Sequence, residues 1–222
     1  MEPAAGQTAG LTGEERGHLA DFVAAQSFRT EAFYKGINPQ IPREQFAPIL
    51  AQLRRSSFLI SIEIADRKWA LMVIETAGVF YLGDNPVVLQ RTEEPADGKN
   101  LGFDVAGVEV LLPLSPKCAL YMPCTATSHD LISGYECALS INEQMSTAAV
   151  RGTSIPSAYF DAWRLARRVK RNTEALYKSL TQGIALAASQ ENIENLNYLQ
   201  CAWSHAAVFS NHTDFAFAKR VY

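Results

Sequence analysis

The sequence predicts an α+β protein in which a central, mostly antiparallel sheet, at about residues 68–122, is flanked by N-terminal and C-terminal α-helices. Apolar residues recur at helical spacing before and after that range, whereas β-rich runs separated by turn residues fill it. With 48% hydrophobic residues, the 222-residue chain can bury a large core without disulfides or metals. We expect residues 13–222 to form one α+β domain that follows a disordered leader over residues 1–12.

Charge and composition exclude several classes of protein. The formal net charge of -3 provides no overall attraction to nucleic acid or to an anionic membrane. The four Cys residues have no CxxC spacing, which favours reduced thiols over a zinc site. No apolar stretch approaches the ~18–20 residues of a membrane span, and the N-terminus lacks the features of a signal peptide. The sequence therefore predicts a soluble, cytoplasmic protein with no metal site.

The N-terminal segment predicts two helices. Thr12 and Glu15 have the spacing of a capping box, and the helix they begin is expected to end near Gly36. A second amphipathic helix is expected over residues 43–54. Residues 57–64 fit either a strand or a continuation of that helix, and we favour the helix because no turn residue separates the two.

The central segment predicts a series of short strands. Residues 69–76 and 79–82 are expected to pair as a hairpin across Ala77-Gly78. A strand resumes at residues 87–89 after a turn. Residues 108–112 and 118–122 then form a further pair of strands around the corner at 113–116.

The C-terminal segment predicts three helices. The first covers residues 130–151, a long one follows Pro156, and Ser189 caps the last. The basic run at 164–171 within the long helix has two interpretations. A solvated helix face is favoured, and contacts to nucleic-acid phosphates are the alternative.

The turn Gly83-Asp84-Asn85-Pro86 is the first candidate for function. Asn85 precedes a proline and is pushed out of the α region, and the Asp84 carboxylate can close an Asx-turn. A rigid turn between two strands is therefore a sufficient explanation. The alternative is that Asp84 and Asn85 present a carboxylate and an amide to a pocket.

Polar residues on the first helix form a second candidate. Gln26, Arg29 and Thr30 share the stripe of apolar residues that should face the core, where polar groups need partners. Either Arg29 pairs with a carboxylate such as Asp84, or these groups line a cleft for an anionic or hydrogen-bonding ligand.

Two further polar stretches have simple default interpretations. Asn197, Gln200 and Ser204 lie on one side of the last helix, and exposure to solvent is the default there. Ser115 lacks the GxSxG elbow of a hydrolase, so its hydroxyl is expected to close a turn.

Four short motifs in order resemble those of an uncharacterised, mainly bacterial family, the domain-of-unknown-function family 4238. They are the Gln26-x-x-Arg29-Thr30 segment, the Phe80-Tyr81-Leu82 run that leads into the Asp84-Asn85-Pro86-Val87 turn, Pro113-Leu-Ser-Pro116, and a C-terminal Leu196-Asn197 with Val208-Phe209-Ser210. Gly83 stands where the family usually has Ser, and the family's N-terminal His-Tyr-x-Pro segment has no counterpart. The resemblance implies a link to mobile elements and phage defence, and hence a toxin or defence-type effector role.

These observations lead to one main hypothesis and two rivals. We expect a polar cleft at the helix–sheet junction, with Asp84 as the catalytic base or metal ligand and a phosphate-containing ligand. The residues expected to line it are Gln26, Arg29, Thr30, Asp84, Asn85 and Asn197. The rivals are a non-catalytic binding module whose motif residues are structural, and nucleic-acid binding through residues 164–171. The residues identify no cofactor, partner or oligomeric state.

Overall fold

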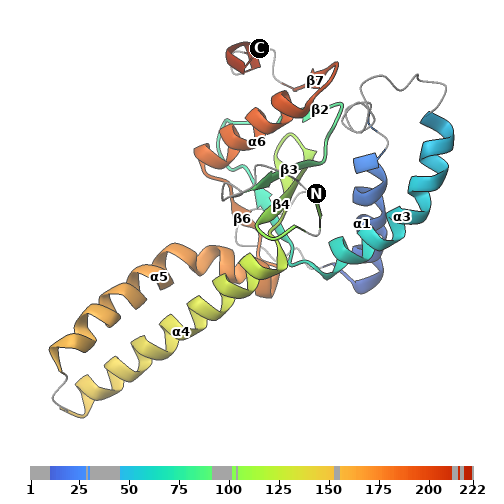
Figure 1. The fold of residues 1–222 in the computed structure, drawn as a ribbon. Coiled ribbons are helices and arrows are strands. Elements are labelled where there is room, and N and C mark those ends of the chain that lie inside the picture. Colours follow the sequence, from blue (N-terminus) through green and yellow to red (C-terminus); the bar gives the residue numbers. More distant parts are fainter. Residues whose placement is uncertain are drawn as a thin grey trace.

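The computed structural model describes residues 11–28, 30, 46–91, 102–103, 105–152, 156–211, 215 and 218–221. The predicted leader lies outside these residues as far as Gly10. The elements follow the predicted order of helices, sheet and helices (Figure 1). They are α1 (Gly13–Phe28), α3 (Phe46–Asp66), β1 (Ala70–Val73), β2 (Leu82–Gly83), β3 (Val88–Arg91), β4 (Val108–Ser115), β5 (Cys118–Met122), α4 (Thr125–Val150), α5 (Ser157–Gln182), β6 (Leu186–Ala187), α6 (Gln190–Trp203), β7 (Val208–Phe209) and α7 (Ala218–Val221).

The main sheet confirms the predicted α+β class. Its strand order is β3-β4-β5-β1-β6. The first three neighbouring pairs are antiparallel, with Val88 opposite Leu111 and Leu111 opposite Tyr121. The fourth pair is parallel: β6 follows the C-terminal end of α5 and runs beside β1 in the same direction. The sheet is therefore mostly antiparallel, and β6 comes from outside the predicted range of 68–122.

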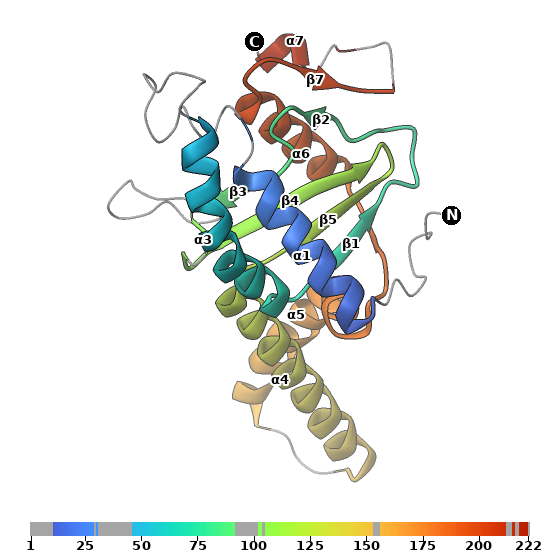
Figure 2. The same cartoon turned by 90° about the vertical axis from the view of Figure 1, so that its right-hand side faces the viewer.

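Helices cover the two faces of this sheet (Figure 2). Side chains of α1 and α3, such as Val23 and Ile64, pack with Val87 and Val110 on one face. Side chains of α6, such as Leu196, pack on the other face against the next residues of the same strands. Successive strand residues point to opposite faces, so both rows are buried. Full burial of each such side chain contributes about 1.5–3 kcal/mol.

The N-terminal helices agree with the sequence except at one boundary. Thr12 accepts a bond from the Glu15 N–H at 3.2 Å, and its own N–H donates to the Glu15 carboxylate at 2.9 Å, which confirms the capping box. The helix ends at Phe28 rather than near Gly36. Ser27 bonds back to the Val23 carbonyl at 2.9 Å, a local contact that weakens the helical ladder. The helix favoured at 57–64 is confirmed as part of α3.

The predicted hairpin between residues 69–76 and 79–82 is wrong. β1 pairs with β5 and β6, while β2 pairs with β7 in a separate two-stranded sheet. The segment between them follows the β4–β5 corner instead, because Ile74 N–H donates to Lys117 O and Phe80 N–H to Pro116 O, both at 2.9 Å. Their β-rich composition identified these residues as extended but did not identify their partner.

The helices α4 and α5 form a long antiparallel hairpin that projects away from the sheet (Figures 1 and 2). Near the sheet, the Tyr135 and Tyr177 rings stack with their centroids 4.1 Å apart. α4 begins at Thr125, earlier than the predicted Asp130, because the Cys124 side chain caps it. Thiols are not among the preferred caps, so the sequence contained no recognisable start signal there. Gly183, with a φ of 68°, ends α5 in the left-handed region.

Candidate functional site

The helix α6 is joined to the segment before the Gly-Asp-Asn-Pro turn by the Asn197 side chain. Its Oδ1 accepts the Tyr81 N–H at 2.7 Å, and its Nδ2 donates to the Val79 carbonyl at 2.9 Å. One amide thus supplies both bonds that a neighbouring strand would have made. Asn197 is buried, which contradicts the default expectation of exposure for this side of the helix.

Gln200 repeats this arrangement one helical turn further on. Its Oε1 accepts the Gly83 N–H at 2.7 Å, and its Nε2 donates to the Pro86 carbonyl at 2.9 Å. The side chain is 0% exposed. Sequence reasoning missed this role. The available signal was a pair of amide residues three apart on the helix face that carries Leu196.

Asp84 holds the loop that follows α6. Its two carboxylate oxygens accept the backbone N–H groups of His205 at 2.9 Å and Ala206 at 2.8 Å. Burial alone would raise the pKa of Asp84, but these bonds, with one from Ser204, outweigh it and lower the pKa below its ordinary value. A carboxylate in this state accepts protons poorly. It fixes the loop that follows α6 and does not close the expected Asx-turn, because the donor of such a turn would be the N–H two residues on, which Pro86 lacks.

The six residues predicted to share a cleft fall into separate groups. Asp84, Asn85 and Asn197 lie together at the junction of α6 with the turn, where Asn85 Nδ2 approaches the Trp203 carbonyl at 3.5 Å. Gln26 is buried on α1, whose residues pack on the opposite sheet face from α6. Thr30 is buried in a bend after α1, and Arg29 lies outside the described residues.

A hollow of about 220 Å³ opens beside this junction, and we call it the motif groove. Its walls come from three distant parts of the chain: the segment before the turn, the β4–β5 corner and the end of β7. They are Phe80, Leu82, Pro113, Leu114, Ser115, Pro116, Phe209, Ser210 and Asn211. Leu82, Leu114 and Phe209 are 42%, 44% and 58% exposed. The groove is therefore mainly apolar, with polar groups on part of its wall.

The corner that forms one wall of the groove is held rigidly. The Ser115 hydroxyl accepts the Lys117 N–H at 3.1 Å, which confirms its predicted turn-closing role. The Lys117 ammonium donates to the carbonyls of Thr76 at 2.6 Å and Gly78 at 2.7 Å. This cation satisfies two loop carbonyls, so the loop before β2 and the corner keep a defined spacing.

A second polar cluster lies on the α6 side of the sheet, and sequence reasoning did not find it. Tyr121 donates to one oxygen of Glu109 at 2.6 Å, and Gln90 donates to the other at 2.9 Å. Asn195 of α6 donates to Gln90 at 2.7 Å. Burial, followed by the charge and bond of Glu109, raises the pKa of Tyr121 far above its ordinary value. The neutral phenol is thus retained as a donor.

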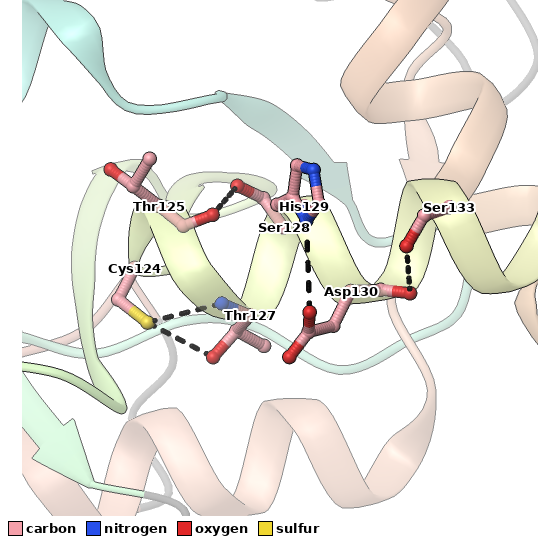
Figure 3. Close-up of polar contacts among 7 residues, drawn as sticks. All are labelled: Cys124, Thr125, Thr127, Ser128, His129, Asp130 and Ser133. Atoms are coloured by element: carbon pink, nitrogen blue, oxygen red, sulfur yellow. Dashed lines mark hydrogen bonds and ion pairs between the residues drawn. The ribbon is translucent and has the colours of Figure 1, made fainter.

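The start of α4 carries a thiol, a histidine and a carboxylate (Figure 3). The buried Cys124 thiol accepts the N–H groups of Gly107 at 3.2 Å and Thr127 at 3.3 Å. Burial alone would raise the pKa of Cys124, but bonds from Thr127 and nearby backbone groups lower it overall. His129 faces exposed Asp130 at 3.7 Å rather than the thiol. The thiol therefore acts as a helix cap.

Within the described ranges of the chain, no group of three or more His, Cys, Asp or Glu side chains is arranged to hold a metal ion. Across the same ranges, no helix combines the length and apolar character needed to cross a bilayer.

The fold and the junction between α6 and residues 79–86 define a class of α+β protein. In it, side-chain amides of a C-terminal helix hydrogen-bond the backbone of an extended segment and its turn. The chain belongs to the family described as "Protein of unknown function (DUF4238)", whose model matches residues 4–214. Neither curated proteins nor solved structures gave a match to this chain.

Proposed function

We propose that this protein is a non-catalytic binding module that holds an apolar side chain of a partner polypeptide in the motif groove. The observation that carries the proposal is the convergence of three motif segments on one hollow. Residues 80–82, 113–116 and 209–211 are far apart in the sequence, yet all line the groove. Each of these segments belongs to, or directly adjoins, a different motif of the family resemblance. The groove is therefore one surface that three separate motifs share.

The size of the groove favours an anchor side chain over a complete small-molecule ligand. Pockets for drug-sized ligands occupy about 300–1,000 Å³, whereas the groove measures about 220 Å³. Its exposed rim of Leu82, Leu114 and Phe209 suits an aliphatic or aromatic anchor. Buried anchors of this kind supply most of the binding free energy at protein interfaces. The exposed Asn211 adds an amide donor and acceptor for the backbone of the bound segment.

The surroundings of the groove support binding without reorganisation. Asn197 and Gln200 tie the segment at residues 79–86 to α6 through four bonds to backbone groups. Lys117 fixes the opposite wall. A preformed site loses little conformational entropy when it is occupied, which favours affinity.

The rival hypothesis is a defence or toxin-type effector whose polar cleft acts on a phosphate-containing ligand. It requires Asp84 as a base or metal ligand. Backbone N–H groups occupy both oxygens of Asp84, and its pKa is lowered, so it is a poor base in this arrangement. For this reason we place the structural interpretation of the turn ahead of the catalytic one.

A peptide-display selection tests the proposal. The purified protein is exposed to a random twelve-residue library, and enriched peptides are measured by fluorescence anisotropy. We expect the enriched peptides to share one apolar position, and we expect Leu114→Asp to weaken their binding at least tenfold, about 1.4 kcal/mol. Leu139→Asp on α4 is the matched control, because Leu139 is 36% exposed and Leu114 44%.

Two outcomes contradict the proposal. One is a selection that enriches no peptide with an apolar anchor. The other is enrichment of peptides whose binding is the same for the Leu114→Asp and Leu139→Asp variants. If Asp84→Asn instead abolishes turnover of a phosphate-containing compound while leaving the melting temperature unchanged, the effector hypothesis is preferred.

A further inference from the structure

The outer face of α5 carries a stripe of arginines on the projecting hairpin. Arg164, Arg167, Arg168 and Arg171 are all exposed. Residues on the other side of the same helix, such as Ala166 and Leu180, are buried. Since residues three and four apart share a helix face, the four guanidinium groups point to the same side. The stripe extends for about 10 Å, given a rise of 1.5 Å per residue.

Little negative charge opposes this stripe. No Asp or Glu occurs between Ala162 and Thr173 in the sequence. Among the ion pairs of the described residues, the stripe takes part in one, between Arg164 and exposed Asp161 at 3.4 Å. Glu174 is engaged by Lys178 at 2.8 Å. The stripe therefore keeps a local positive field although the whole chain carries a formal charge of -3.

Aromatic rings adjoin the arginines. The Arg167 guanidinium lies over the Trp163 ring, 5.0 Å from its centroid, and Phe160 meets the same ring edge to face at 6.4 Å. Tyr159 and Phe160 are exposed at the outer end of the hairpin. Arginine and exposed rings together provide bidentate phosphate contacts and stacking surfaces for bases.

We infer that the α5 stripe is a contact surface for nucleic acid, which it binds through backbone phosphates and without reading sequence. A duplex carries one phosphate charge per about 1.7 Å with both strands counted, so a length of duplex equal to the stripe carries about six. An anionic membrane is a poorer partner, because the continuous apolar side of α5 packs against α4, and the large apolar side chains of α5 that stay exposed are three, Tyr159, Phe160 and Leu165. This site is separate from the motif groove and its test is independent.

Fluorescence anisotropy with a labelled 20-base-pair DNA duplex and its single strand tests the inference. The full chain is compared with Arg167→Gln/Arg168→Gln at sodium chloride concentrations from 50 to 200 mM. The matched control is Lys68→Gln/Lys219→Gln, which removes two exposed charges elsewhere. We expect the arginine variant to bind about tenfold more weakly at 50 mM salt. Its log–log salt slope on the duplex should be shallower by about 1.8, the value for two lost phosphate contacts.

Three results would overturn the inference. The first is no binding of either DNA at 50 mM salt. The second is an equal loss of affinity in the lysine control, which would indicate a nonspecific charge effect. The third is displacement of the DNA by poly-glutamate at the same charge concentration, which would indicate an acidic protein as the partner. Unchanged circular dichroism melting of each variant establishes that the fold is intact.

Discussion

The side-chain amide of Asn197 accepts the backbone N–H of Tyr81 at 2.7 Å and returns a bond to the carbonyl of Val79 at 2.9 Å. A single helix residue thereby replaces an edge partner for an extended segment 116 positions away in the sequence. Gln200 does the same for the next part of that segment. The Gly-Asp-Asn-Pro turn is thus positioned by α6 rather than by a neighbouring strand of the main sheet.

Asn197→Ala should destabilise the fold. The change removes the acceptor of the Tyr81 N–H and the donor to the Val79 carbonyl, both in a buried setting. Loss of a partner for a buried polar group costs about 1–3 kcal/mol, so we expect the free energy of unfolding to fall by about 2–4 kcal/mol. Urea unfolding measures this. Asn172→Ala, at an exposed position on α5, is the control, and a loss no larger than the control's would contradict this role.

Gly83 should resist substitution because Ser204 occupies the space of a side chain. A Cβ at residue 83 would lie 2.3 Å from Ser204 Oγ and 3.0 Å from the Gln200 carbonyl oxygen. We expect Gly83→Ala to cost about 1–3 kcal/mol through overpacking. Because Ser204→Ala removes the nearest atom, the double variant should lose less stability than the two single changes summed.

Thermal and urea unfolding of the four species in this cycle measure the coupling. Gly134→Ala is the control, since nothing lies within 4 Å of a Cβ built there. That change should leave stability unchanged or raise it by about 0.5–1 kcal/mol. Strict additivity between residues 83 and 204 would show that the close approach has no energetic consequence.

Asp84 should make stability sensitive to acid. Its folded pKa lies below the unfolded value of about 3.9, because backbone N–H groups stabilise the charged form. Its contribution is therefore complete above that pH and is lost as the pH falls through the folded pKa. We expect Asp84→Asn to lower the free energy of unfolding at pH 7, and we expect the difference in this free energy between variant and wild type to shrink toward pH 3. Urea unfolding at both pH values tests this.

Asp161→Asn provides the comparison for acid sensitivity, because the Asp161 side chain is 84% exposed. If the difference in the free energy of unfolding between wild type and Asp84→Asn stays constant from pH 7 to pH 3, the carboxylate charge does not hold the loop.

Tyr121 should make stability sensitive to alkali. Burial and Glu109 raise its folded pKa above the unfolded value of about 10. The contribution is complete below pH 10 and is lost as the pH rises, because the unfolded chain then releases a proton that the folded chain retains. Between pH 9 and pH 11, wild type should lose more stability than Tyr121→Phe. Tyr159→Phe, at an exposed ring, should behave like wild type in the same titration.

Most elements were predictable because their signals are local. The Thr12–Glu15 capping box and the Ser189 cap mark helix starts through bonds to residues three apart, and both are present. The Cys124 cap was missed because thiols rarely serve in that position. The hairpin expected between residues 69–76 and 79–82 failed for a different reason. A β-rich composition and a nearby turn indicate that a segment is extended, but they do not identify the strand with which it pairs.

The candidate site was only partly accessible to sequence reasoning. Asp84, Asn85 and Asn197 were singled out and do lie together, whereas Gln26 is on the other side of the sheet. Gln200 was expected to be exposed and is fully buried. The spacing of Asn197 and Gln200 indicates a shared helix side, but it does not identify the backbone groups, more than a hundred residues away, that the Gln200 amide meets.

The sequence by itself determined the α+β class, the order of N-terminal helices, central sheet and C-terminal helices, and the Pro113–Pro116 corner, because caps, turns and periodicity act over a few residues. Only the tertiary structure decided that α6 supplies the partners of residues 79–86, and that three distant segments enclose one groove. The physical reason is that buried backbone groups must find partners wherever the packed chain places them. That requirement is satisfied by spatial neighbours, which local periodicity does not encode.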